Sequence, residues 1–188
     1  MLTYIAGKLT NSIMTDCENE QEYELCRYGC EIWLYTIIST MGLLLIGAIL
    51  GAILETIVII TIFYLCQSNG GGYHASSHVK CFITMAIGLI LSLAFLHISF
   101  PLQLYYIFLC ISSAFLFMNP LCLHENKKHL VNKAATLKIR SRIVCISIVF
   151  FIWMCSLLGQ DIITRSGCIA LFASALSRLY ALVHPHKR

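Results

Sequence analysis

The chain has 188 residues, of which 59% are apolar and 12% are charged, and its formal net charge is +4. A soluble domain carries about twice that share of charged residues, and a chain of this size needs them to cover its surface. Composition therefore excludes an ordinary soluble domain, and the long apolar runs indicate an integral membrane protein. The first residues are not expected to form a secretory signal, because they lack a basic region and acids follow them.

Residues 1–30 form a polar segment that we expect to lie at the membrane interface or in the cytoplasm. Apolar residues near its start recur at helical spacing, namely Leu2, Ile5, Leu9 and Ile13. That spacing predicts an amphipathic helix on the bilayer surface. Acidic residues follow at Asp16, Glu18, Glu20, Glu22 and Glu24. They form either a solvated helix face or loop, which is the commoner case, or a docking surface for a basic partner.

Residues 31–188 are predicted to form an all-α, polytopic membrane domain of about six transmembrane or re-entrant helices. The run from Glu31 to Cys66 is apolar except for Glu55, and it is too long for one straight span of about 20 residues. We expect a turn near Gly47 and Gly51, because a Glu55 in mid-span would be costly. The alternative is that this G-x-x-x-G pair packs helices closely. Further spans are expected at about 81–98, 101–118, 142–159 and 163–183.

Basic residues predict the topology. The loop 119–142 contains one acid, Glu125, and these basic residues: Lys127, Lys128, Lys133, Lys138, Arg140 and Arg142. Because positive loops stay on the cytoplasmic side, counting spans outward gives cytoplasmic N- and C-termini and a cytoplasmic segment 67–81. Arg178 is close enough to the end of the last span for its side chain to reach the interface.

Ten cysteines do not by themselves predict disulfides or a metal site. Five lie inside apolar runs, where cysteine behaves as a small hydrophobe: Cys66, Cys110, Cys145, Cys155 and Cys168. No Cys-x-x-Cys pair is repeated, so a structural zinc site is not expected.

The segment 67–81 combines a glycine turn, two histidines and Cys81 at a membrane edge. We expect Cys81 near a helix N-terminus, where the helix amides and Lys80 favour the thiolate, and a thiol beside a base can act as a nucleophile. On one helix His78 and Cys81 are neighbours. His74 is seven residues away, or roughly 10 Å along a helix, and reaches Cys81 only if the backbone folds back around the glycines.

Other interpretations of these residues remain open. His74 and His78 have the spacing of a zinc-binding pair, but the metalloprotease pattern needs Glu where this chain has Ala75. The histidines could also simply face water while Cys81 packs. A second group, Cys122, His124 and His129, ranks lower because no glycine turn supports it.

Three segments resemble a known family. The most specific is Gly71-Gly72-Tyr73-His74-Ala75 with Cys81 seven residues after His74, in a membrane protein. Weaker matches are Tyr28-Gly29, and Asn119-Pro120 followed by Glu125-Asn126-Lys127-Lys128. With these motifs most of the chain resembles AgrB, the membrane-embedded cysteine endopeptidase of bacterial peptide quorum sensing. Family members often carry an arginine shortly before the glycines, whereas this chain has Gln67-Ser68-Asn69-Gly70.

The resemblance implies that Cys81 is the nucleophile and His74 the general base. The implied substrate is an AgrD-like propeptide with an amphipathic N-terminal helix, a central cysteine-bearing segment and a charged C-terminal tail. Its tail is removed through a thioester acyl-enzyme, which leads to a cyclic thiolactone autoinducing peptide. The implied setting is the bacterial cell membrane, in contact with lipid and as a homodimer. No cofactor, metal or nucleic-acid partner is expected.

Residues around the catalytic pair are candidates for supporting roles: His78, Gly71, Gly72, Lys80, Asn69 and Ser77. The third catalytic residue and the oxyanion donors stay open among Asn69, Ser76, Ser77 and the backbone amides near Gly71. Two other functions are retained as alternatives, a non-enzymatic membrane transporter or scaffold and a zinc-dependent membrane peptidase. Glu55 is the sole acid inside an apolar run, so a transport path has little support.

Overall fold

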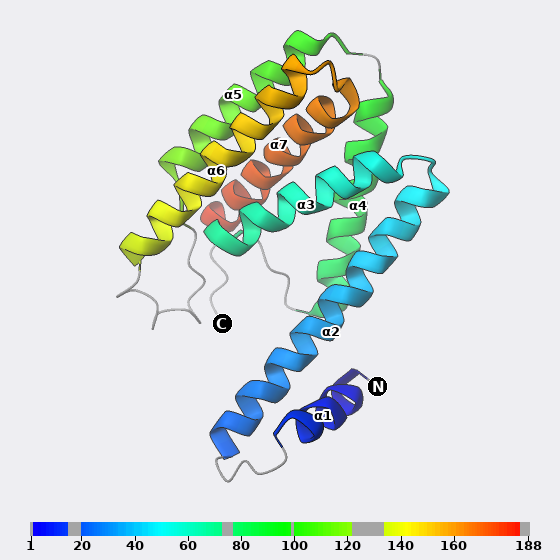
Figure 1. Cartoon of the computed structure of the whole chain (residues 1–188), viewed down its shortest axis with the longest axis vertical. Helices are drawn as coiled ribbons and strands as arrows, with labels where there is room; N and C mark the ends of the chain where they lie inside the picture. Colours follow the sequence, from blue (N-terminus) through cyan, green and yellow to red (C-terminus); the bar gives the residue numbers. More distant parts are fainter. Residues whose placement is uncertain (1, 15–19, 73–76, 99, 122–133, 185–188) are drawn as a thin grey trace. The chain divides into compact units, whose positions relative to one another are not determined.

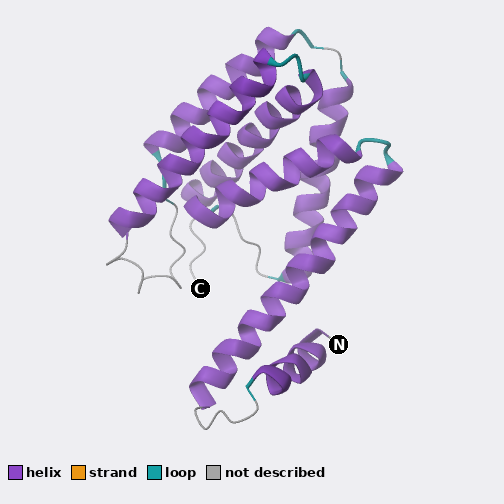
Figure 2. Ribbon diagram, in the orientation of Figure 1, coloured by secondary structure: helices purple, strands orange, loops and turns teal. Residues whose placement is uncertain are grey.

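The computed structural model describes residues 2–14, 20–72, 77–98, 100–121 and 134–184. These residues form seven helices and no strand (Figures 1 and 2). The helices are α1 (Leu2–Ile13), α2 (Glu20–Ile49), α3 (Ile53–Gly70), α4 (His78–His97), α5 (Leu102–Met118), α6 (Ala134–Leu157) and α7 (Asp161–Val183). The predicted all-α architecture is therefore confirmed.

Most of these helices have the dimensions of membrane spans. Among the described residues, five helices are long and apolar enough to cross a membrane, namely α2, α3, α4, α6 and α7. The apolar helix α5 is shorter, with 17 residues. Large apolar side chains face outward on these helices, including Trp33, Ile87, Ile111 and Phe150. Exposed apolar surface of this extent is what a polytopic membrane protein presents to lipid.

The first of two compact units comprises residues 1–46. In it α1 has two different faces, because Ala6 and Thr10 are buried while most of its large apolar side chains are exposed. Its position at the bilayer surface stays a prediction. The Tyr23 hydroxyl donates to Oδ1 of Asn11 over 2.6 Å and so links α2 to α1.

The second unit comprises residues 47–188 and has α7 at its centre. α7 contacts α3, α4, α5 and α6 (Figure 1). Half of its most apolar stretch is buried, against 17% for α4. Small residues allow these close approaches: a Cβ on Gly167 would lie 2.8 Å from Cγ1 of Ile152. Of the polar residues that weaken α7 as an apolar span, Ser174 and Arg178 are buried and Ser177 is half-buried.

The glycine pair between α2 and α3 serves in both of the ways considered from the sequence. Gly51 has a φ of 67°, so it forms the turn in a conformation that other residues rarely adopt. Gly47 provides close packing, because a Cβ there would overlap the buried side chain of Thr56. Glu55 consequently lies in the first turn of α3 rather than in mid-span, and the predicted turn is confirmed.

Two helices extend beyond their predicted apolar spans. α2 begins at Glu20, inside the acidic stretch, and α6 begins at Ala134, about two turns ahead of the predicted span 142–159. The predicted limits followed apolar residues alone, whereas a helix continues into the headgroup region as long as its backbone bonds are made. The extension of α6 carries Lys138 and Arg140, and Arg142 is the first residue of the predicted span.

We expect Gly47→Ala and Gly51→Ala each to lower the thermal stability of the detergent-solubilised protein. Overpacking against Thr56 costs about 1–3 kcal/mol, and an alanine at the positive φ of Gly51 costs about 1–2 kcal/mol. Gly88→Ala is the matched control, since a Cβ there meets nothing within 4 Å. A midpoint that falls as far for Gly88→Ala as for the other two variants would contradict this account.

Candidate functional site

Cys81 lies in the first turn of α4, and its side chain is half-buried. Ser77 caps this helix: its Oγ accepts a bond of 3.3 Å from the Lys80 N–H, and its carbonyl accepts one of 3.0 Å from the Cys81 N–H. The amides of a first turn carry partial positive charge, so negative charge is favoured at this position. The thiol is thus both accessible and placed at the electropositive end of a helix.

The structure describes only one of the two histidines that were predicted as partners of Cys81. His78 is the first residue of α4 and is exposed, three residues before Cys81 on the same helix. Residues at this spacing are neighbours on a helix surface. His74 and Ser76 lie outside the described residues, so the contact between His74 and Cys81 stays a prediction. The second Cys–His group lies outside them as well: Cys122, His124 and His129.

The glycine segment, residues 70–72, is a close-packed corner, and each of its three glycines is required for a different structural reason. A Cβ on Gly70 would overlap Nη2 of Arg178, and a Cβ on Gly72 would overlap Oε1 of Gln67. Gly71 has φ 72° and ψ 177°, a backbone region open essentially to glycine alone. Its N–H donates to the Gln67 carbonyl over 2.9 Å and ends α3.

Arg178 joins the ends of two helices from inside the bundle. Its Nη2 donates to the Cys66 carbonyl at 3.1 Å, its Nε to the Gly71 carbonyl at 3.3 Å, and its Nη1 to the Asn119 carbonyl at 2.9 Å. Gly71 and Asn119 are the C-caps of α3 and α5, where helices leave carbonyls without an internal partner. The expectation that Arg178 reaches the membrane interface is wrong, because the residue is 2% exposed.

A second polar link between α3 and α7 lies beside the first. Nε2 of Gln67 donates to Oγ of Ser177 over 2.6 Å. Neither Gln67 nor Arg178 was among the predicted site residues. The sequence did carry a signal, because polar and ionisable residues inside an apolar helix generally face the protein interior. Arg178 should therefore have been expected to face the protein rather than the lipid interface.

Two candidates for a third catalytic residue already have partners in their own helices. Nδ2 of Asn69 donates to the Leu65 carbonyl over 2.8 Å, and the Ser77 hydroxyl serves as the cap of α4. Asn69 also lines, with Ser141 and Arg178, an internal void of about 10 Å³. That is close to the least volume that holds one water molecule.

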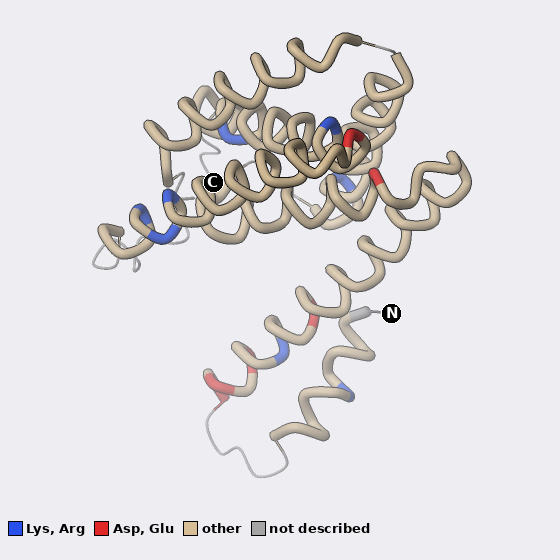
Figure 3. Tube along the Cα trace, turned by 45° about the horizontal axis from the view of Figure 1, so that its top comes forward, with Lys and Arg blue, Asp and Glu red and all other residues tan. Residues whose placement is uncertain are grey.

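Charge is distributed unevenly along the second unit (Figure 3). Of its six described basic residues, four lie where α3 and α5 end and α6 begins, namely Lys138, Arg140, Arg142 and Arg178. The other two are Lys80 near the start of α4 and Arg165 near the start of α7. Arg142 fixes this arrangement, because its Nε donates to the Phe117 carbonyl over 3.3 Å and its guanidinium lies 5.0 Å from the Phe117 ring. The described acids lie at the other ends of their helices, Glu55 on α3 and Asp161 on α7.

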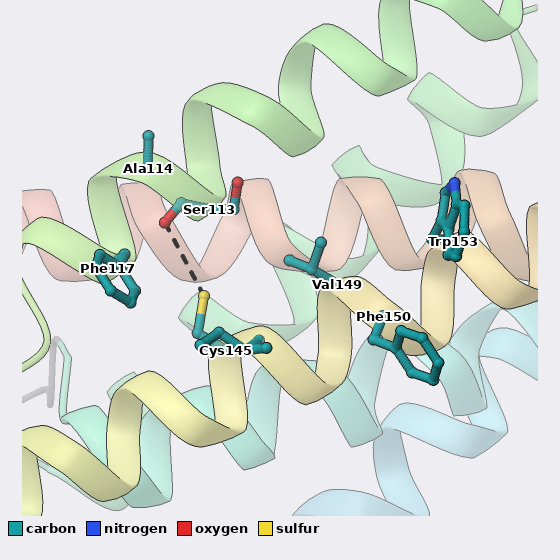
Figure 4. Close-up of a pocket in the computed structure, with 8 residues that line it drawn as sticks. Ser113, Ala114, Phe117, Cys145, Val149, Phe150 and Trp153 are labelled. Atoms are coloured by element: carbon teal, nitrogen blue, oxygen red, sulfur yellow. Dashed lines mark hydrogen bonds between the residues drawn. The ribbon is translucent and has the colours of Figure 1, made fainter.

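A hollow of about 490 Å³ between α5 and α6 lies apart from these residues (Figure 4). Its lining is mostly apolar: Ser113, Ala114, Phe117, Cys145, Ile146, Val149, Phe150 and Trp153. The Cys145 thiol points across it to the Ser113 carbonyl at 4.0 Å. No lining residue belongs to α4 or to the glycine segment, so the hollow is not part of the candidate site.

We expect a charged, water-soluble maleimide to label Cys81 and to leave Cys168 unlabelled. Cys81 is half-buried at a helix end, whereas Cys168 is 0% exposed on α7. Cys110 is the control that separates exposure to lipid from exposure to water, because it is exposed in the middle of α5 and should not react. Mass spectrometry of the cysteine-bearing peptides measures the result. Equal labelling of Cys168 and Cys81 would contradict the central position of α7.

Comparison with known proteins agrees with the motifs in the sequence. The family model described as "AgrB: Accessory gene regulator B" matches residues 3–178. No curated protein and no solved structure matches the chain. The matched region runs from α1 to the buried Arg178 and includes the glycine segment and Cys81. Since it covers nearly the whole sequence, the chain belongs to the AgrB, or accessory gene regulator B, family.

Proposed function

We propose that this chain is a membrane cysteine endopeptidase that removes the C-terminal tail of an AgrD-like propeptide and leads to a cyclic thiolactone. Cys81 is the nucleophile and His74 the general base. The observation that carries the proposal is the position of Cys81, half-buried in the first turn of α4 just after the glycine segment. Membership of the AgrB family is consistent with a role in the agr quorum-sensing system.

The first half of the reaction transfers an acyl group to the enzyme. The imidazole of His74 takes the proton of the Cys81 thiol, and the sulfur attacks the peptide carbonyl before the propeptide's tail. The carbon–nitrogen bond then breaks. The imidazolium gives its proton to the leaving amine, so the tail departs with a neutral amino group. The product is a thioester between Cys81 and the rest of the propeptide.

The second half transfers that acyl group to the propeptide's own cysteine. Its thiol gives a proton to the imidazole and attacks the thioester, and Cys81 leaves with the proton returned. One thioester replaces another, so ring closure needs no ATP. Holding both reacting groups in one bound chain raises the effective concentration of the second thiol. Water must be kept from the intermediate, since hydrolysis would consume it.

We propose that this chemistry takes place at the cytoplasmic side of the bacterial cell membrane. Support comes from the basic residues at the start of α6 and the acids at the opposite helix ends, because basic residues are retained on the cytoplasmic side. The amphipathic α1 and the substrate's amphipathic helix would lie along the same lipid surface. A homodimer, implied by the family resemblance, is part of this proposal.

We expect Cys81→Ala and His74→Ala each to abolish propeptide cleavage while the protein still inserts in the membrane. Cys110→Ala is the matched control, since that thiol lies on the outer surface of α5 and should not affect cleavage. Cleavage is followed by mass spectrometry of the propeptide co-expressed with each variant. Full cleavage by Cys81→Ala would exclude the proposed nucleophile.

His78→Ala decides between the two histidines. If His74 is the base, His78→Ala should retain most of the activity and His74→Ala should retain none. The reverse pattern would assign the base to His78, which lies one turn before Cys81 on α4. Inhibition by a chelator, with restoration by added zinc, would instead favour the zinc-dependent alternative.

A further inference from the structure

The buried arginine of α7 holds the point at which the backbone leaves α3. We propose that Arg178 is a positioning residue of the candidate site: by binding the Gly71 carbonyl it sets the direction in which the chain departs towards His74. This inference rests on the proposed function, because it matters for catalysis only if the segment after Gly71 carries a reacting group.

The geometry of the guanidinium makes it suited to this role. Nε and Nη2 bind two carbonyls of the same helix end, those of Gly71 and Cys66, at 3.3 and 3.1 Å. Guanidinium donors are held in one rigid plane. Two bonds from that plane fix the orientation of the helix end as well as its place. A single donor, such as a lysine ammonium, would fix the position of the helix end but not its orientation.

The arginine is itself held in place from other directions. Its Nη1 binds the Asn119 carbonyl at the end of α5 over 2.9 Å, and Gly70 leaves no room between α3 and the guanidinium. Ser177, the residue before it on α7, binds Gln67 one helix turn before Gly71. These bonds therefore fix the end of α3 relative to both α5 and α7.

Two fixed ends limit what the seven residues between α3 and α4 can do. Arg178 holds the Gly71 end, and Ser77 holds the other end as the cap of α4. Only two residues separate Gly71 from His74 in the sequence, so the direction of the backbone at Gly71 limits where the imidazole can lie. Reacting groups tolerate little error, since a misplacement of about 1 Å can lower the rate about 100-fold.

The first test is kinetic and uses the full-length protein in membranes with propeptide. We expect Arg178→Gln to lower kcat about 100-fold while KM stays within about threefold. Arg178→Lys should recover part of the loss, because a lysine can still reach one carbonyl. Arg165→Gln is the control: Arg165 is also on α7, but it lies near Tyr105, 5.6 Å from that ring. It should leave kcat unchanged.

The second test asks whether Arg178 acts through His74. The rate at which iodoacetamide alkylates Cys81 is measured in the parent protein, in Arg178→Gln, in His74→Ala and in the double variant. We expect each single change to slow alkylation and the double change to slow it no further, since coupled residues are not additive. Additive losses would overturn the proposal, because Arg178 would then act on Cys81 by another route.

Folding is checked separately by the protection of Cys168 from a soluble maleimide. If Arg178→Gln exposes Cys168, the conclusion rests on Arg178→Lys and on Ser177→Ala, which removes the link to Gln67. Normal kcat in both of these variants would overturn the proposal. Failure of the proposed function looks different: His74→Ala would then leave both cleavage and Cys81 alkylation unchanged, whatever Arg178 does.

Discussion

The structure of this chain depends on one buried cation bound to the carbonyls of two helix ends. An arginine in mid-membrane costs about 2.5–3.5 kcal/mol on insertion scales, whereas each hydrogen bond to a charged group contributes about 1.5–3 kcal/mol. Arg178 makes three such bonds, and two of them go to the C-cap carbonyls of Gly71 and Asn119, which have no partner within their own helices. These bonds offset the cost of burial in this arrangement of α3, α5 and α7, and an arrangement that separates the three helix segments would lose them.

That constraint also explains the glycines before the proposed catalytic histidine. A run of glycine suggests a flexible hinge, but here the segment is a tightly packed corner. Gly70 makes room for the guanidinium, Gly72 makes room for Gln67, and Gly71 adopts a conformation closed to other residues. An alanine at any of the three would disturb a different contact. The motif is thus as much a requirement of packing as of backbone freedom.

Much of the fold could be predicted from the sequence, because lipid imposes a simple rule on helix length and polarity. The split of the first apolar run at Gly51 followed from its length and from Glu55. The start of α6 could not be predicted in this way, since backbone hydrogen bonding rather than hydropathy determines where a helix begins. Arg178 was placed wrongly because closeness to the end of a span was taken to mean exposure. Its partners are backbone carbonyls, which leave no mark in the sequence.

The candidate site was predictable in part. The position of Cys81 at a helix N-terminus could be reasoned from the residues, and the structure places it in the first turn of α4. The choice between His74 and His78 could not, because helical spacing and family resemblance favour different residues. Spacing describes a continuous helix, and α3 and α4 are separate helices joined through the glycine corner.

The order of the helices along the chain has a consequence for biosynthesis. α7 is the centre of its unit but the last of its helices to leave the ribosome. Until it enters the bilayer, the earlier helices lack their common partner and the carbonyls at the ends of α3 and α5 lack their arginine. A nascent or truncated chain would therefore insert without an assembled corner.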